Sequence, residues 1–182
     1  MQYIILDLEA TCWSDRSSEK ISEIIEIGAI RVDHTGQTRD SFEAFVRPVL
    51  HPTLSDFCTE LTTIRQEQVD VAAPFPSVIN DFQKWIGVGT KSHILGSWGY
   101  YDRKQLEKDC KLHEISCEWL DPHFSVKHQF AKLAQLRRPC GLGQALDKEG
   151  LTFEGTPHRG IDDAKNIARI FVRYFGQWTI PM

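Results

Sequence analysis

The sequence predicts an α/β domain with a mixed central β-sheet flanked by α-helices, and three observations support this prediction. The chain has 182 residues, of which 41% are hydrophobic and 25% charged, as in one soluble globular domain. Short apolar segments rich in strand-forming residues come first, and apolar segments with helical spacing follow. Three strands in a meander, then strands alternating with helices, favour one layered domain over residues 1–182.

The first part of the chain supplies the meander. Residues 3–8 are apolar and dense in strand formers, which is typical of a central strand buried on both faces. We expect two further strands over residues 21–32 and 41–47, joined by a hairpin turn at residues 34–37. Residues 48–61 are predicted to be an irregular surface connection.

The second part alternates between strands and helices. Apolar residues recur at helical spacing in several segments, and shorter apolar runs lie between them. The expected strands cover residues 92–98 and 118–121, and the expected helices cover residues 75–86, 102–113, 126–136 and 160–175. A Pro- and Gly-bearing stretch at residues 137–143 is predicted to be a surface loop.

Composition excludes several classes of protein. No apolar run is long enough to span a membrane, and the first residues lack the basic opening of a signal peptide. Five cysteines without a Cys-x-x-Cys pair indicate reduced thiols and a cytoplasmic location. The net charge of −4 argues only against a strongly basic, non-specific nucleic-acid binder.

An Asp-x-Glu pair ends the first predicted strand. Asp7 and Glu9 are two residues apart, so on a strand their side chains share one face. Two carboxylates on one face of a buried strand repel each other, and a divalent cation between them would relieve the cost. Alternatively, the strand ends at Leu6 and both acids are solvated in a loop.

Two further acids open predicted helices. Asp102 lies where a strand leads into a helix, and its spacing to Gln105 also fits a simple capping box. Asp163 follows His158 by five residues at the start of the last helix, where acids also complement the helix dipole. Each of these two observations therefore has a structural explanation as well as a catalytic one.

The acids become informative as a set. A mixed sheet could bring Asp7, Glu9, Asp102 and Asp163 together, and four converging carboxylates require cations. Oxygen ligands without Cys or His suit Mg²⁺ or Mn²⁺, and two such ions about 4 Å apart can bind a phosphodiester. His158 could accept the proton of an attacking water near neutral pH.

This ordered set resembles the DEDDh (DnaQ-like) 3′–5′ exonucleases of the ribonuclease H-like fold. The resemblance extends from Tyr3 to about Phe175 and is strongest to the ERI-type branch, the enhanced-RNAi and histone-mRNA 3′ exonuclease-like enzymes. The stretches that carry it are Leu6-Asp7-Leu8-Glu9-Ala10-Thr11-Cys12-Trp13, residues 23–29 (EIIEIGA), the spaced residues from His51 to Val69, and Gly96-Ser97-Trp98.

The resemblance implies a function and roles for residues. It implies that Asp7, Glu9, Asp102 and Asp163 bind two divalent cations, Mg²⁺ or Mn²⁺, and that His158 is the general base. The expected activity is removal of nucleoside 5′-monophosphates from the 3′ ends of single-stranded nucleic acid, with RNA favoured over DNA. It further implies that the terminal nucleotide contacts residues in two groups: Ala10, Thr11, Phe57 and Leu61, and an aromatic near Asp102.

Two departures from the family pattern matter. In some ERI-type proteins a Trp directly precedes the mid-chain Asp, whereas here Gly99-Tyr100-Tyr101 intervenes, so either Trp98 or Tyr101 could stack on the terminal base. A SAP-type nucleic-acid-binding extension of some relatives is not expected here. The alternatives are an inactive nucleic-acid-binding module of the same fold, a DNA-directed exonuclease and an endonuclease. Phe57, Leu61 and Trp98 could instead be core residues.

Of three other patterns, two have simpler explanations, and the third indicates substrate contacts. Cys110, His113 and Cys117 lie on one helical face but lack a fourth zinc ligand. Glu23 and Glu26 lie among apolar strand residues, which we interpret as exposure at a sheet edge. Arg103 and Lys104 are expected to meet a substrate backbone.

Overall fold

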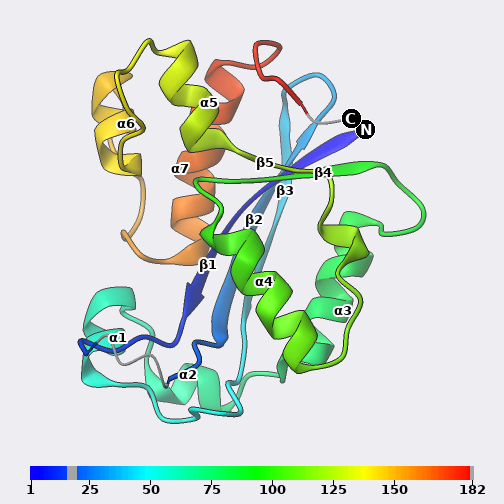
Figure 1. The fold of residues 1–182 in the computed structure, drawn as a ribbon, viewed down its shortest axis with the longest axis vertical. Helices are drawn as coiled ribbons and strands as arrows, with labels where there is room; N and C mark the ends of the chain where they lie inside the picture. The colour runs from blue at the N-terminus through cyan, green and yellow to red at the C-terminus, as the bar shows by residue number, and fades with distance from the viewer. Residues whose placement is uncertain (16–19, 181–182) are drawn as a thin grey trace.

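A five-stranded mixed sheet forms the centre of the computed structural model, which describes residues 1–15 and 20–180 (Figure 1). The strands are β1 (Gln2–Ala10), β2 (Ile24–Asp33), β3 (Thr38–Phe45), β4 (His93–Ser97) and β5 (His123–Ser125), in the spatial order β3-β2-β1-β4-β5. β2 pairs antiparallel with β1 and β3, whereas β1, β4 and β5 are parallel. The predicted meander with added parallel strands is confirmed.

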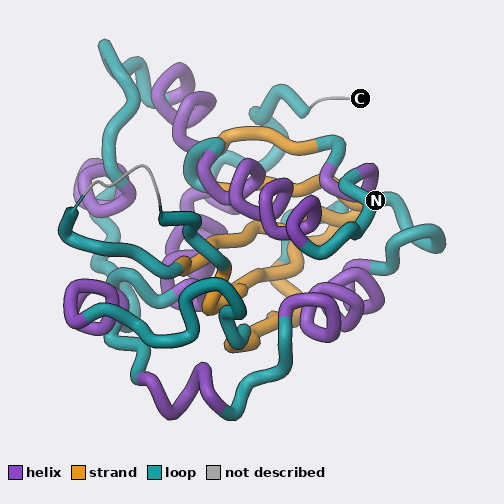
Figure 2. Tube along the Cα trace, turned by 60° about the horizontal axis from the view of Figure 1, so that its bottom comes forward, coloured by secondary structure: helices purple, strands orange, loops and turns teal. Residues whose placement is uncertain are grey.

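Helices cover both faces of the sheet (Figure 2). One face carries α3 (Phe75–Ile86) and α4 (Tyr101–Leu112), and the other carries α5 (Val126–Leu133), α6 (Leu142–Lys148) and α7 (Gly160–Arg173). Two short helices, α1 (Asp56–Thr62) and α2 (Gln66–Asp70), follow β3. In Figure 1 they lie together at the end of the sheet where β1 terminates.

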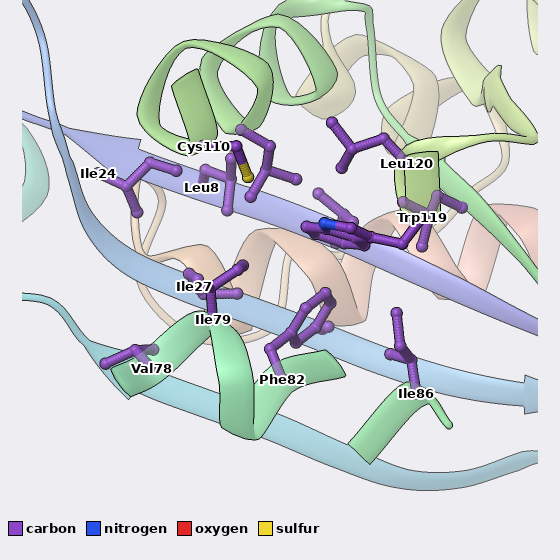
Figure 3. Packing of buried hydrophobic residues seen from close by; sticks show 14 of the residues in the cluster. Leu8, Ile24, Ile27, Val78, Ile79, Phe82, Ile86, Cys110, Trp119 and Leu120 are labelled. Atoms are coloured by element: carbon purple, nitrogen blue, oxygen red, sulfur yellow. The ribbon is translucent and has the colours of Figure 1, made fainter. Parts of the chain in front are cut away.

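The α3–α4 face holds the first core cluster. Ile4, Leu6 and Leu8 of β1 alternate with residues on the other face and pack with α3, α4 and the short segment around Trp119. Figure 3 shows Leu8 and Phe82 in this layer, between the strands and the helices. Burial of these side chains fixes the register of β1, because a shift by one residue would expose every one of them.

The α7 face holds the second cluster and determines where the acids lie. Tyr3 and Ile5 of β1 pack against α7, so Asp7 and Glu9 continue the same face toward the start of that helix. β1 extends to Ala10, which excludes the alternative in which the strand ends at Leu6. Both acids therefore belong to a central strand.

Two glycines allow α7 to approach the sheet closely at this point. A Cβ at Gly28 of β2 would lie 2.1 Å from the backbone carbon of Gly160, and one at Gly160 would lie 3.1 Å from the carbonyl oxygen of Asp7. Side chains at either position would push the first turn of α7 away from β1 and β2. The glycine pair thus brings the start of α7 next to Asp7.

Several predicted boundaries were wrong. Residues 118–120 form a short 3₁₀ helix, and the fifth strand follows at His123–Ser125, because Trp119 and Leu120 turn into the first core cluster. The connection predicted over residues 48–61 contains the start of α1, which Ser55 caps by accepting the amide of Cys58. Within the described ranges, no helix is long and apolar enough to cross a membrane.

Candidate active site

Four carboxylates from three elements face one hollow of about 430 Å³. Asp7 and Glu9 come from β1, Asp102 from the first turn of α4, and Asp163 from the first turn of α7. His158, just before α7, lines the same hollow. The structure therefore brings together all five residues predicted from the sequence as the acidic set and its histidine.

Asp102 is held against β1. Its Oδ1 accepts the backbone N–H of Leu8 at 3.2 Å, which links the start of α4 to the strand between the two acids. The capping-box interpretation was wrong, because Tyr100 is the N-cap residue and the Gln105 amide donates instead to the carbonyl of Ser22 and to Asp109.

His158 and Asp163 are held in one loop-to-helix turn. The backbone N–H of His158 donates to Oδ2 of Asp163 at 2.8 Å, and His158 has a left-handed φ of 62°. Side-chain atoms of Glu9, His158 and Asp163 lie within 4.8 Å of one another. The imidazole and two carboxylates thus face the same small volume.

Glu26 holds this turn to the sheet. It lies opposite Glu9 on β2 and is fully buried, and its carboxylate accepts the Arg159 guanidinium and the N–H of Gly160 at 2.9 Å. The expectation that Glu23 and Glu26 lie exposed at a sheet edge was wrong, because β3 pairs with β2 at Glu26 and the amides of residues 49–51 surround the Glu23 carboxylate. Glu26 was missed because Arg159 lies far away in sequence.

The electrostatics of the four acids are unfavourable for the charged forms. Burial and then the neighbouring carboxylates raise the pKa of Asp7 well above its ordinary value and the pKa of Glu9 to about 9. Burial raises the pKa of Asp102 to about 6 and raises the pKa of Asp163. Among the described residues, no Lys, Arg or His side chain forms an ion pair with any of the four.

The donor set fits hard divalent cations. Carboxylates that are buried together without cationic partners gain from an ion that neutralises them, and oxygen donors are the ligands that Mg²⁺ and Mn²⁺ prefer. The thiols and imidazole of Cys110, His113 and Cys117 do not converge on a comparable point within the described chain, where the ring of His113 stacks on Phe75. The site therefore suits Mg²⁺ or Mn²⁺ rather than a thiolate-bound metal.

Two aromatic rings form part of the wall. Trp98 and Tyr101 both line the hollow, together with Gly99, Lys127 and Leu142. The indole N–H of Trp98 donates to the carbonyl of Cys140 at 3.2 Å and its ring packs against the second core cluster, whereas the side chain of Tyr101 is 55% exposed. Trp98 is fixed in the wall, and Tyr101 projects from it.

The other predicted contact residues do not line the hollow. Ala10 and Thr11 are buried, and the Thr11 hydroxyl accepts the amide of Glu23. Phe57 and Leu61, one helical turn apart on α1, are 39% and 36% exposed. They are outside the core clusters, which excludes their interpretation as core residues.

Near the site, the prediction for Arg103 was wrong and one lysine was missed. Arg103 is paired with Asp121 at 2.8 Å and with Glu107, so it is not free to meet a substrate backbone. Lys127 lines the hollow and was missed, because nothing in the sequence distinguishes it from other lysines on an amphipathic helix.

Comparisons with known proteins identify a family that this chain matches. The family model described as "Exonuclease" (RNase_T) matches residues 4–171. The human 3′-5′ exoribonuclease 1 is 37% identical over 93% of this chain and 51% of its own length. Human ERI1 exoribonuclease 2 is 34% identical over 91% of this chain and 27% of its own length. The chain thus spans about a quarter to a half of these curated relatives.

A solved structure is also similar over the whole chain. The nuclease domain of 3′hExo, which is described as a DEDDh family member bound to rAMP, superposes with a TM-score of 0.92 at 34% identity. That match covers 100% of this chain and 96% of the other. At this identity and coverage, the similarity extends to the family as well as the fold.

Proposed function

The chain belongs to the RNase_T exonuclease family, in its DEDDh branch, and on this basis we propose that it is a 3′–5′ exonuclease. Its substrate is the 3′ end of single-stranded nucleic acid, preferably RNA, and its products are nucleoside 5′-monophosphates. The observation that carries the proposal is the convergence of Asp7, Glu9, Asp102, His158 and Asp163 in one hollow.

The proposed cation ligands are the four carboxylates, with Glu9 central. Glu9 lies next to Asp7 on the same face of β1 and within 4.8 Å of the ligand atoms of His158 and Asp163. When bound, two divalent cations would supply charge neutralisation for the phosphodiester and for the oxygens that attack and leave. In their absence, burial raises the pKa values of these acids.

Proton transfer is assigned to His158, and the neighbouring residues hold it in position. His158 lies at the mouth of the hollow with an exposed imidazole, so it can take the proton of an attacking water and release it to solvent. Its backbone bond to Asp163 and the anchoring of Arg159 by Glu26 hold its position relative to the acids. This support from buried groups suits a residue that must meet a reacting atom accurately.

The terminal nucleotide would lie along the aromatic wall. The exposed ring of Tyr101 offers a surface for base stacking, and Lys127 offers a cation for a phosphate. We propose that the exposed pair Phe57 and Leu61 contacts the other side of the base, with the strand end around Ala10 and Thr11 supporting the sugar. These contacts do not depend on base identity.

The preference for RNA rests on the relatives. Human 3′-5′ exoribonuclease 1 and ERI1 exoribonuclease 2 are named for action on RNA, and one related structure is described as 3′-end recognition of histone mRNA stem-loop. We propose the same preference for RNA in this chain, without assigning it a particular RNA substrate. A cytoplasmic location belongs to the same proposal and rests on the cysteine content.

A 5′-labelled single-stranded RNA, incubated with Mg²⁺ or Mn²⁺, tests the proposal. We expect stepwise shortening from the 3′ end, release of nucleoside 5′-monophosphates, no cleavage of a circular RNA and slower digestion of the matching DNA. Asp7→Ala should abolish shortening, whereas Asp81→Ala, at an exposed acid on α3, should not.

Binding without metal-dependent shortening would indicate an inactive binding module instead. Cleavage of the circle would indicate an endonuclease, and faster digestion of DNA would reverse the proposed substrate preference. An Asp7→Ala variant as active as the unmodified chain would refute the assignment of the site.

A further inference from the structure

A second hollow of about 250 Å³ adjoins the candidate active site. Tyr100, His128 and Lys132 line it, together with Gln177 near the end of the described chain. None of these residues has a role in the hydrolysis proposed above. The hollow is smaller than the catalytic one, and polar and aromatic groups dominate its walls.

The two hollows are built from the same two segments. Trp98, Gly99 and Tyr101 line the catalytic hollow, and Tyr100, between them in sequence, lines the second one. Likewise Lys127 lines the first hollow and His128 the second. Neighbouring residues of the same two segments therefore line both hollows, which places the hollows on either side of a shared wall.

Hydrogen bonds fix these two segments to each other. The carbonyl oxygen of Trp98 accepts the N–H of Lys127 at 2.8 Å and the hydroxyl of Ser125 at 3.0 Å. The first turn of α5 is thus attached to the turn that precedes α4, beyond the ends of β4 and β5 in Figure 1. The shared wall is built in the folded chain and needs no rearrangement.

Exposed rings cover the second hollow. Tyr100 is 48% exposed, and its ring lies 5.2 Å from that of His128 at an angle of 30° and 5.9 Å from that of His123. An exposed, supported aromatic face is what single-stranded nucleic acids use for stacking, independent of base identity. The residues between Trp98 and Asp102 supply this ring.

The charges around the two sides of the catalytic hollow differ. Lys127 and Lys132 on α5 have no carboxylate within 4.0 Å among the residues the structure describes, and neither do Arg137 and Arg138 just beyond the helix. The opposite side, formed by α1 and α2, carries four acids: Asp56, Glu60, Glu67 and Asp70. A phosphate backbone is attracted to the first side and repelled by the second.

We propose that Tyr100, His128 and Lys132 form a second nucleic-acid subsite, which binds the nucleotides upstream of the 3′-terminal one. The single strand then leaves the active site across α5, with a base on Tyr100 and phosphates near Lys127 and Lys132. This inference rests on the proposed exonuclease function and adds the direction of the substrate and a dependence on its length.

The test compares two substrates with the same 3′-terminal nucleotide. The 4-nitrophenyl ester of a ribonucleoside 5′-monophosphate carries only that nucleotide and its scissile phosphate, whereas a ten-nucleotide RNA strand reaches the second hollow. The variants are Tyr100→Ala, Tyr100→Phe and Lys132→Ala, and the matched control is Lys91→Ala, at an exposed lysine before β4 without an ion pair in the described chain. Thermal unfolding checks that each variant is folded.

We expect the unmodified chain to have a lower KM for the longer strand. Tyr100→Ala should reduce this advantage about fivefold or more, the low end for loss of one stacking contact, and Tyr100→Phe should retain it. Lys132→Ala should reduce the slope of log KM against log salt by about 0.7 for the longer strand, because one phosphate contact is lost. Lys91→Ala should change neither quantity.

Three outcomes would overturn the subsite. These are an equal change in KM for both substrates, variants that behave like Lys91→Ala, and a Tyr100→Phe variant as weak as Tyr100→Ala. Failure of the function is distinguishable, because it would abolish hydrolysis of both substrates by the unmodified chain. In that case, fluorescence anisotropy of the labelled ten-nucleotide strand in EDTA measures the same contribution of Tyr100 and Lys132 to binding.

Discussion

Two neighbouring groups of buried acids in this protein have opposite environments. Glu23, just before β2, and Glu26 on β2 are surrounded by donors: Glu23 accepts three backbone amides from residues 49–51, and Glu26 accepts hydrogen bonds from Arg159 and Gly160. The β1 acids Asp7 and Glu9 face other carboxylates. Glu9 and Glu26 are directly opposite each other across the two strands.

The difference separates structural acids from functional ones. A buried carboxylate that the chain supplies with donors is complete in the folded state and stabilises it. A group of carboxylates left without cationic partners costs free energy, which an external ligand can recover on binding. Burial of an acid alone therefore does not identify a functional site, whereas a lack of hydrogen-bond donors and cations to satisfy the buried acid does.

Glu9→Gln should give the largest effect. The rate of RNA shortening should fall by about 10⁴-fold, the scale for loss of a group that the reaction requires. In EDTA at pH 7 the same variant should be more stable by about 1–4 kcal/mol, because the folded chain no longer has to keep Glu9 protonated at a pH where the unfolded chain ionises it. Single-turnover assays and urea unfolding measure the two quantities, and a loss of stability in EDTA would contradict the comparison.

His158→Ala tests the residue that lies where the two groups meet. Its backbone is bonded to Asp163, and Arg159, the next residue, is bonded to Glu26. Turnover should fall by about 10²–10³-fold, as expected for loss of a general base, while the affinity for Mn²⁺ measured by titration calorimetry stays the same. An equal loss of both would make His158 a structural or ligand residue instead.

Glu26→Gln, the same chemical change as in Glu9→Gln, should have the opposite effect on stability. It leaves the Arg159 guanidinium without its buried partner and should cost about 1–3 kcal/mol in urea unfolding. Activity should fall as well, because the turn that carries His158 loses its attachment. A Glu26→Gln variant that is as stable as the unmodified chain would show that Glu26 behaves like the β1 acids.

The sequence predicted the β1 acids but not the role of Glu26. Asp7 and Glu9 are recognisable because alternation on a strand is a local property, and the ordered positions of Asp102, His158 and Asp163 complete the set. The partner of Glu26, Arg159, is 133 residues away, so no local pattern reveals it. In isolation, an acid in an apolar strand resembles an exposed edge residue.

Local sequence patterns also limited how much of the fold could be predicted. The prediction for α3 matched the structure at both ends, because five apolar positions repeat at helical spacing over twelve residues. The helices α1, α2 and α6 have five to seven residues each, too few for a periodic signal, and were missed. Tertiary contacts decide such short helices, and also the position of β5 after Trp119.

The pH dependence of stability without metal tests the raised pKa of Glu9. The pKa of Glu9 is raised to about 9, so between its unfolded value and pH 9 the folded state retains a proton that the unfolded state releases. Stability in EDTA should therefore fall as pH rises from 7 to 8.5, by up to about 1.4 kcal/mol per pH unit.

This range of pH also avoids interference from His123. Its burial lowers its pKa to about 4, which makes stability rise with pH only below about 6.5. Urea midpoints measured at several pH values give the slope. Glu9→Gln should reduce the fall in stability, and an equal slope in this variant and the unmodified chain would mean that Glu9 is ionised in the metal-free protein.

Glu23→Gln should give the smallest effect, although Glu23 is as buried as Glu26. Its carboxylate accepts the amides of Val49, Leu50 and His51, and an amide side chain keeps one acceptor oxygen for them. Because the lost bonds are to neutral donors in a surface connection, we expect a cost of about 0.5–1.5 kcal/mol in urea unfolding. Turnover should be unchanged, since this connection carries none of the five site residues. A large loss of turnover would mean that β2 transmits strain from residues 49–51 to β1, and the two groups of acids would then be coupled rather than separate.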